Sequence, residues 1–400
     1  MQKEKLVPAI RFKGFDEEWE VNRLSSYLSV VVRRNEQLSY SQNEVLSVSK
    51  DSGVINQIKY LGRSYAGSDL RNYKILELSH IVYTKSPLSE TPFGIIKANS
   101  YEQGIVSTLY ATYEPSSVCH PNFIEHYFSK YDRLNNYLHL LVNKGAKNTL
   151  LISDEAALGG YVVFPSFDEQ KKISDLLDNL AMLIQSQELK LKKLNEVKQS
   201  LLNKIFALYD QKVPEIRFSG YNTEWNLKTL EQIAEITFGQ SPLSIYYTDK
   251  KTDHILVQGN ADVKNRWVYP RIYTSQITKR AFIGDIIFSV RAPVGSVARS
   301  NYDIVIGRGV AAIKGDDFIY FNLLWKEISQ FWKSKSSGST FDSIASSELD
   351  KSEISVPSDL SEQQKIGAFF SSLDSLIRSQ EQKLEKLNNI KQALLEKMFC

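Results

Sequence analysis

Residues 168–206 read DEQKKISDLLDNLAMLIQSQELKLKKLNEVKQSLLNKIF, and residues 361–399 read SEQQKIGAFFSSLDSLIRSQEQKLEKLNNIKQALLEKMF. Aligned without a gap, the two stretches lie 193 positions apart and share about half of their residues. An internal repeat of this kind determines the architecture of a chain before any other signal does. The sequence is therefore built from two related halves.

Apolar residues recur through both stretches with alternating spacings of four and three positions, which is the pattern of a coiled-coil helix. The first seam consists of Ile173, Leu177, Leu180, Ile184, Gln187, Leu191, Leu194, Lys198, Leu201 and Ile205. The second seam consists of Ile366, Phe370, Leu373, Ile377, Gln380, Leu384, Leu387, Lys391, Leu394 and Met398. Neither stretch contains proline, so each is predicted to form one uninterrupted helix.

A helix of this length would extend roughly 55 to 60 Å at about 1.5 Å per residue. Its apolar stripe is too long for one domain core to cover, so we expect the two copies to pack on each other. Ordinary bundle packing would explain a single stripe of this kind, but the duplication favours mutual pairing. Gln187 and Gln380 lie within the seams, where a polar residue costs some stability and fixes the register.

The composition is typical of a globular protein that can bury a core, with 42% hydrophobic and 24% charged residues in a chain of 400. The net charge of +3 is too small to indicate a polyanionic partner by itself. Cys119 and Cys400 are the only cysteines, which excludes a disulfide scaffold and fits a reducing compartment. Because the start lacks a signal-peptide pattern and no apolar run is long enough for a membrane span, we expect a cytoplasmic protein with no membrane partner.

A second duplication precedes the helices. Residues 7–24 read VPAIRFKGFDEEWEVNRL and residues 213–230 read VPEIRFSGYNTEWNLKTL, at an offset of 206 positions. We call these two stretches the lead-in motifs. Each half of the chain thus consists of a lead-in motif, a globular segment and a long helix.

The two globular segments resemble each other little in sequence. Both are rich in Tyr, Val, Ile and Thr with frequent Gly and Pro breaks, which predicts a strand-rich α+β fold, with one shorter helix in each at 122–141 and 318–333. The predicted organisation is a pseudo-twofold repeat with globular domains at 1–165 and 209–357 and long helices at 166–208 and 358–400.

The chain resembles the specificity subunits of type I restriction-modification systems over its full length. The resemblance rests on the paired lead-in motifs, on the Glu-Gln pairs that follow Pro165 and Pro357, and on the LLxKxF endings of both helices. Each motif alone is weak, but the ordered set occurs twice.

This resemblance implies a non-catalytic DNA reader without a cofactor. The globular segments would be target recognition domains, each reading one half of a split sequence in double-stranded DNA. The helices would form an antiparallel coiled coil that sets the distance between the halves and docks two methyltransferase subunits. In the family, two further motor-nuclease subunits complete an assembly that restricts unmethylated DNA.

Basic and amide side chains in loops with Gly, Ser or Pro are the candidates for DNA contact, because loops can enter a groove and present donors to bases or phosphates. Gln258 and Asn260 could pair with adenine, although such residues more often form a turn. Any single basic residue is more often a solvated surface charge. The candidates are Lys85, Lys144, Lys147, Gln258, Asn260, Arg291, Arg308 and Lys335.

Arg11 and Arg217 belong to both lead-in motifs, so we expect them to serve structure or partner docking, since a base-reading residue should differ between half-sites. Trp19 and Trp225 are predicted core anchors.

The sequence contains no phosphate-binding GxxxxGK[ST] loop, no methyltransferase Asn/Asp-Pro-Pro-aromatic signature and no His pair at metal-ligand spacing. We therefore expect no catalytic activity and no metal. Two alternatives stay open: a coiled-coil scaffold that joins two ligand-binding domains without touching DNA, and a nuclease or methyltransferase with an unfamiliar signature.

Overall fold

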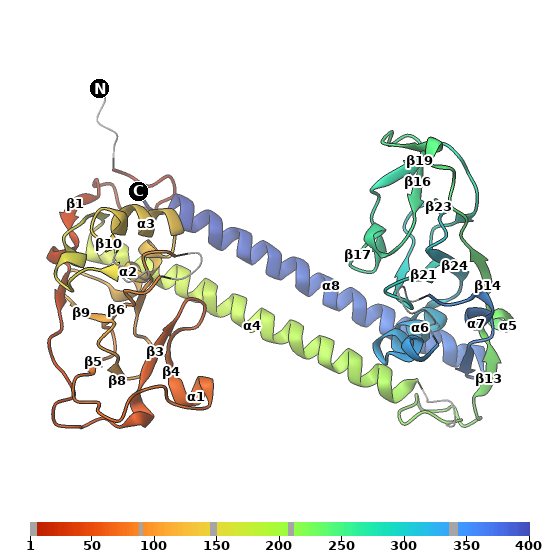
Figure 1. Cartoon of the computed structure of the whole chain (residues 1–400), viewed down its shortest axis with the longest axis horizontal. Coiled ribbons are helices and arrows are strands. Elements are labelled where there is room, and N and C mark those ends of the chain that lie inside the picture. The colour runs from red at the N-terminus through yellow and green to blue at the C-terminus, as the bar shows by residue number, and fades with distance from the viewer. Residues whose placement is uncertain (1–5, 88–90, 145–149, 207–211, 336–342) are drawn as a thin grey trace. The chain divides into compact units, whose positions relative to one another are not determined.

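The computed structural model describes residues 6–87, 91–144, 150–206, 212–335 and 343–400. The chain is an α+β protein, as the sequence predicts, and divides into two compact units. Unit 1 consists of residues 1–187 and 383–400, and unit 2 consists of residues 188–382. Each unit therefore combines one globular region with parts of both long helices (Figure 1).

The long helices are α4 (Phe167–Ile205) and α8 (Leu360–Lys397). Every predicted seam residue on them is buried or half-buried. In unit 1 the first turns of α4 share a core with the last turns of α8, through Ile173 and Leu395. In unit 2 the last turns of α4 share a core with the first turns of α8, through Ile205 and Ile366. Because the start of one helix meets the end of the other in each unit, the helices run antiparallel.

Unit 1 is built on a four-stranded antiparallel sheet in the order β2-β9-β6-β7. Smaller pairs β1-β12, β3-β4, β5-β8 and β10-β11 surround it. Its strands are β1 (Glu20–Arg23), β2 (Leu28–Val30), β3 (Leu46–Ser49), β4 (Gly53–Asn56), β5 (Lys74–Leu76), β6 (Ile81–Tyr83), β7 (Ile96–Ala98), β8 (Gly104–Val106), β9 (Ala111–Pro115), β10 (Asn143–Lys144), β11 (Leu150–Leu151) and β12 (Tyr161–Phe164). Its shorter α-helices are α1 (Gln57–Leu61), α2 (Pro121–Phe128) and α3 (Tyr131–His139).

Unit 2 has a six-stranded sheet in the order β14-β24-β21-β22-β18-β17 and a five-stranded sheet in the order β15-β19-β16-β23-β20. Its strands are β13 (Asn226–Thr229), β14 (Glu235–Phe238), β15 (Tyr247–Thr248), β16 (His254–Val257), β17 (Val263–Lys264), β18 (Trp267–Val268), β19 (Ile272–Thr274), β20 (Arg280–Ala281), β21 (Ile286–Ser289), β22 (Val297–Arg299), β23 (Ile304–Ile306), β24 (Val310–Lys314) and β25 (Glu353–Val356). Its shorter α-helices are α5 (Leu230–Ile233), α6 (Asp317–Ile328) and α7 (Ser346–Asp350).

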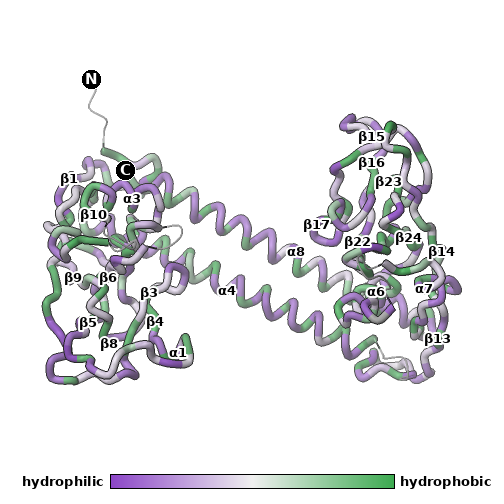
Figure 2. Tube along the Cα trace, viewed as in Figure 1, coloured by the Kyte–Doolittle hydropathy of each residue, from purple (hydrophilic) through white to green (hydrophobic). Residues whose placement is uncertain are grey.

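The two globular regions share one topology despite their dissimilar sequences. The order β2-β9-β6-β7 of unit 1 recurs as β14-β24-β21-β22 in unit 2, followed in both by a helix, α2 or α6. The central strands β6 and β21 are buried along their whole length, because other elements cover both faces of the sheet. Figure 2 shows hydrophobic residues along these strands and mainly hydrophilic ones along the long helices.

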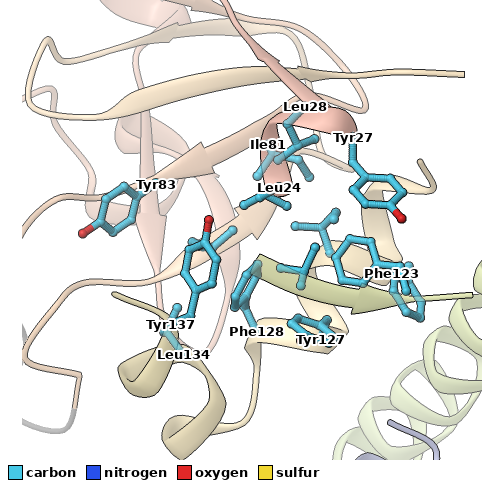
Figure 3. Packing of buried hydrophobic residues seen from close by; sticks show 14 of the residues in the cluster. Leu24, Tyr27, Leu28, Ile81, Tyr83, Phe123, Tyr127, Phe128, Leu134 and Tyr137 are labelled. Carbon is cyan, nitrogen blue, oxygen red and sulfur yellow. The ribbon is translucent and has the colours of Figure 1, made fainter. Parts of the chain in front are cut away.

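The single helix predicted at 122–141 is wrong in detail, because this segment forms two helices. Lys130, between α2 and α3, has an extended backbone (φ −78°, ψ 121°) that breaks the helical path. The reason is tertiary: the aromatic residues on both sides of the break pack into the core of unit 1 (Figure 3). In unit 2, α6 ends close to Gln330, whose left-handed backbone (φ 59°) starts a short 3-10 turn.

The lead-in motifs anchor each globular region to the ends of the long helices. Trp19 is 2% exposed and packs on Phe123 and Phe399, and Trp225 is 3% exposed and packs on Phe318. Both tryptophans are core anchors, which confirms that prediction.

An ion pair links each lead-in motif to the start of a long helix, and we call this contact region the junction. Arg11 donates from Nε and Nη2 to the two carboxylate oxygens of Glu169 at 2.7 and 2.8 Å, and Arg217 does the same to Glu362 at 2.6 and 2.7 Å. Glu169 and Glu362 lie in the first turns of α4 and α8, where the helix dipole favours a negative charge.

The residue before each arginine contacts the other long helix. The backbone N–H of Ile10 donates to the carbonyl of Lys397 at 2.8 Å, and that of Ile216 donates to the carbonyl of Lys204 at 3.0 Å. Each lead-in motif thus joins the end of one long helix to the start of the other within its own unit.

Arg217→Met should lower the free energy of unfolding of the full chain by roughly 3 to 5 kcal/mol, because it leaves a buried carboxylate without a partner. The double variant Arg217→Met, Glu362→Leu should recover most of this loss, since replacing both partners of a buried pair by apolar residues is often close to neutral. Calorimetric unfolding measures both effects. An unchanged transition in Arg217→Met would show that the pair does not hold the junction.

Candidate nucleic-acid interface

One edge of the four-stranded sheet gathers the loops that connect its strands, and we call it the loop edge. In unit 1, β2 and β6 end there and β9 begins there, with Tyr83 paired to Ala111. In unit 2, β14 and β21 end there and β24 begins there, with Ser289 paired to Val310. Helices α2 and α6 follow the opposite ends of β9 and β24. The loop edge therefore lies at the other end of these strands from the starts of α2 and α6.

The loops at the loop edge of unit 2 pack backbone against backbone through glycines. A Cβ atom on Gly309 would lie 2.0 Å from the carbonyl oxygen of Gln258, and one on Gly239 would lie 2.1 Å from that of Gly307. The N–H of Gly307 also donates to the carbonyl of Val257 at 2.8 Å. Side chains are excluded from these contacts, so the loops that follow β14 and β16 meet the turn before β24.

The amide candidates lie in this cluster of loops. The backbone N–H of Gln258 donates to the buried carboxylate of Asp262 at 2.8 Å, and the Gln258 side chain is half-buried. Asn260 is exposed, and its Oδ1 accepts a hydrogen bond from Ser296 Oγ at 3.2 Å. That bond orients the Asn260 amide and leaves its NH2 group available as a donor.

The basic candidates of unit 2 border the same loops. Arg308 is exposed in the turn before β24, and its backbone N–H donates to Ser241 Oγ at 3.1 Å. Arg291 is exposed after β21 and forms an antiparallel bridge with Ser343. Lys335 is exposed shortly after Trp332, whose ring packs beside Gly295. The structure thus brings the five candidates of unit 2 to one region.

The candidate DNA-contacting residues of unit 1 lie in different surroundings. Lys85 follows β6 at the loop edge, but its Nζ donates to Asp154 at 2.7 Å and its side chain is only 16% exposed. Lys74 donates to the same carboxylate. Lys144 lies on β10, and Lys147 lies outside the described residues.

The pKa of Asp154 reflects these contacts. Burial alone would raise it, but the hydrogen bonds from Lys74 and Lys85 outweigh burial and hold the pKa of this carboxyl below its usual value. Asp154 is therefore charged at neutral pH.

Two arginines at the loop edge of unit 1 are not among the predicted DNA contacts. Arg33 and Arg34 follow β2, and Arg34 is exposed and lies opposite Lys74 in an antiparallel bridge. Arg33 pairs with Glu77 at 2.8 Å. The signal that could have found them is the pair of arginines directly after a strand-like apolar run, VVRR at 31–34.

Within the described ranges, no group of three or more His, Cys, Asp or Glu residues is placed to hold a metal ion. No helix in that part of the chain is both long enough and apolar enough to span a bilayer.

Residues 222–389 match the family model of the type I restriction modification DNA specificity domain. The chain is therefore similar to type I DNA specificity domains over 168 of its 400 residues. Its relatives include the "Putative type I restriction enzyme MjaX specificity subunit" of Methanocaldococcus jannaschii, which is 25% identical over 95% of this chain and 92% of that protein. The MjaIX specificity subunit of the same organism is 28% identical over 44% of each chain.

Solved structures share the fold of this chain. The S subunit from M. genitalium matches with a TM-score of 0.60 at 13% identity, over 98% of this chain and 99% of that one. The HsdS subunit from Thermoanaerobacter tengcongensis matches with a TM-score of 0.50 at 21% identity, over 95% and 96%.

Gly309→Ala should destabilise unit 2 by about 1 to 3 kcal/mol, because the new Cβ overlaps the Gln258 carbonyl and forces the loops apart. Gly259→Ala is the matched control: it lies in the same cluster with an extended backbone (φ 176°), and nothing lies within 4 Å of an added Cβ. Thermal unfolding of both variants measures the difference. Equal stability would show that the loop edge tolerates a wider spacing.

Proposed function

We propose that each globular region reads one half of a bipartite sequence in double-stranded DNA through its loop edge. The observation that carries the proposal is the contrast within the repeat. The two units share topology and junctions, whereas the residues at their loop edges differ. A subunit that reads two different half-sites needs a shared topology with shared junctions, combined with loop edges whose residues differ.

The loop edge of unit 2 offers the chemistry of base recognition. Amide side chains such as Gln258 and Asn260 can pair bidentately with adenine, and arginines such as Arg291 and Arg308 can pair with guanine or with phosphates. These residues lie on loops fixed by glycine contacts, which would hold their side chains in defined positions for contact with DNA.

The long helices serve in this proposal as the spacer between residues 1–165 and 209–357. A stiff helix pair would hold the two reading domains more than one DNA turn apart, about 34 Å. The base pairs between the half-sites would then be free in sequence. Gln187 and Gln380 would fix the register of the helix pair.

A second apolar stripe on the helices supports docking of two equal methyltransferase subunits. Its residues come directly before the seam residues Ile184, Lys198, Ile377 and Lys391. In unit 1 Leu183 and Ile390 are 40% and 50% exposed, and in unit 2 their repeats Leu376 and Val197 are 47% and 50% exposed. A helix with seam residues plus one flanking apolar position is suited to packing against further helices, not against a single partner.

Each unit thus presents an equivalent docking patch. In unit 2 the ion pair between Lys198 and Asp374, at 2.5 Å, brings Val197 and Leu376 to the same level of the two helices. In this proposal the chain itself is non-catalytic and works in the cytoplasm, the methyltransferase subunits carry out the chemistry, and two motor-nuclease subunits join when the assembly restricts DNA.

Methylation mapping of a plasmid or genome that carries this gene with its cognate methyltransferase subunit should reveal one split motif with a fixed unspecified gap. Exchanging residues 226–357 for the matching segment of a relative should change one half of the motif only.

A continuous motif would contradict the division into two readers, as would a change in both halves after the exchange. A complete absence of modification would favour the alternative of a scaffold that does not bind DNA.

The double variant Leu183→Asp, Ile390→Asp places two charges in the docking patch of unit 1. Its affinity for the methyltransferase subunit at that patch should fall by about tenfold or more, since charges placed in an apolar contact must be desolvated. Ser186→Asp and Ser379→Asp, on exposed positions outside the stripe, are the control and should leave assembly unchanged. Analytical ultracentrifugation of the mixed subunits measures the stoichiometry. An unaltered complex would place the docking surface elsewhere.

A further inference from the structure

Two lysines bind one carboxylate at the loop edge of unit 1, and an arginine faces one of these lysines. Lys74 and Lys85 both donate to Asp154, and the side chains of the two lysines are 11% and 16% exposed. One carboxylate cannot balance two ammonium groups. The largely enclosed cluster therefore carries a net charge of +1 before its third cation is counted.

Arg34 is the third cation. It lies directly opposite Lys74 in an antiparallel bridge, where the Cβ atoms of facing residues are about 4.5 to 5.5 Å apart. Like charges in such a pair destabilise a sheet. Arg34 donates to the neutral Oδ1 of Asn72 at 3.3 Å, and no carboxylate of the described residues lies within ion-pair distance of its guanidinium.

Attachment of the segment that contains Asp154 does not require this excess of positive charge. One lysine would satisfy the carboxylate, and the second lysine adds repulsion. Lys85 also adopts a left-handed backbone (φ 48°), which costs on the order of 1 kcal/mol or more for a residue with a side chain and is typical of functional sites. Both features oppose folding, so they indicate a ligand that the folded chain alone does not contain.

We propose that Arg34, Lys74 and Lys85 form a binding site for a backbone phosphate of the target DNA, with Asp154 as the carboxylate that competes with the phosphate for the two ammonium groups. The inference rests on the proposed reading of DNA by unit 1. A phosphate would balance the excess charge and accept hydrogen bonds from ammonium and guanidinium groups. Such contacts fix the register of a reader on the duplex without specifying a base.

Unit 2 matches this site only in part, because Arg291 follows β21 as Lys85 follows β6. The positions of unit 2 that follow the matching strand β14 are occupied by Ser241 and Pro242, which carry no charge. The two half-sites would therefore be held on the backbone by different residues.

The direction in which Asp154→Asn changes the affinity for DNA tests the proposal. Removing the carboxylate leaves the positive charge of the cluster unopposed. We therefore expect DNA affinity to rise by about fivefold at low salt. The measurement uses the full chain assembled with its methyltransferase subunit and a fluorescently labelled duplex of mixed sequence. Glu102→Gln is the matched control: it makes the same change in net charge by breaking the exposed pair with Lys59 in the same unit, and it should change affinity by less than about twofold.

A purely structural role of the cluster predicts no gain in affinity, together with a loss of thermal stability. Equal affinities for Asp154→Asn and Glu102→Gln would therefore overturn the phosphate site. If the unaltered complex bound no DNA at all, the proposed function itself would fail, and the two failures are distinct.

Arg34→Gln gives a second measurement on an exposed residue. It should reduce the slope of log affinity against log salt by about one, as expected for the loss of one phosphate contact. The methylated motif should stay the same, because a phosphate contact carries no sequence information. An altered motif would assign Arg34 to base reading and overturn its place in the phosphate site, as would an unchanged slope.

Discussion

The rest of each unit depends on one bidentate ion pair, Arg11 with Glu169 in unit 1 and Arg217 with Glu362 in unit 2. The glutamates are almost fully buried in the first turn of a long helix, where the helix dipole favours their charge. Loss of one partner from a buried pair is strongly destabilising, because the remaining partner would be an uncompensated charge. The backbone N–H of the preceding isoleucine binds the end of the other helix, so this one contact region fixes the lead-in motif and both helices together.

This junction explains why the chain is constant in one part and variable in another. The pair, the anchoring tryptophans and the helix ends occupy the same places in both halves, and together they form a frame that any sheet of the shared topology can join. The loop edge lies at the opposite ends of the strands from these junctions. Its residues are therefore free to differ between the units without disturbing the frame.

The electrostatics of the chain suit local rather than general attraction of DNA. With a net charge of only +3, the chain as a whole attracts DNA weakly, so positive charge has to be concentrated locally by folding. The two loop edges concentrate it in different ways. Unit 2 exposes separate arginines beside amide side chains, whereas unit 1 gathers two lysines around one half-buried carboxylate.

The sequence by itself determined the duplicated organisation, the α+β class, the long helices with their seams and the burial of both tryptophans. These features depend on local periodicity and on repeated residues, which are visible in one dimension. The tertiary structure alone decided the pairing of Arg11 with Glu169, the shared topology of the globular regions, the break at Lys130 and the enclosure of Lys85. Each of these depends on strand pairing or core packing between segments far apart in the chain, and no local pattern encodes which distant partner a charge will meet.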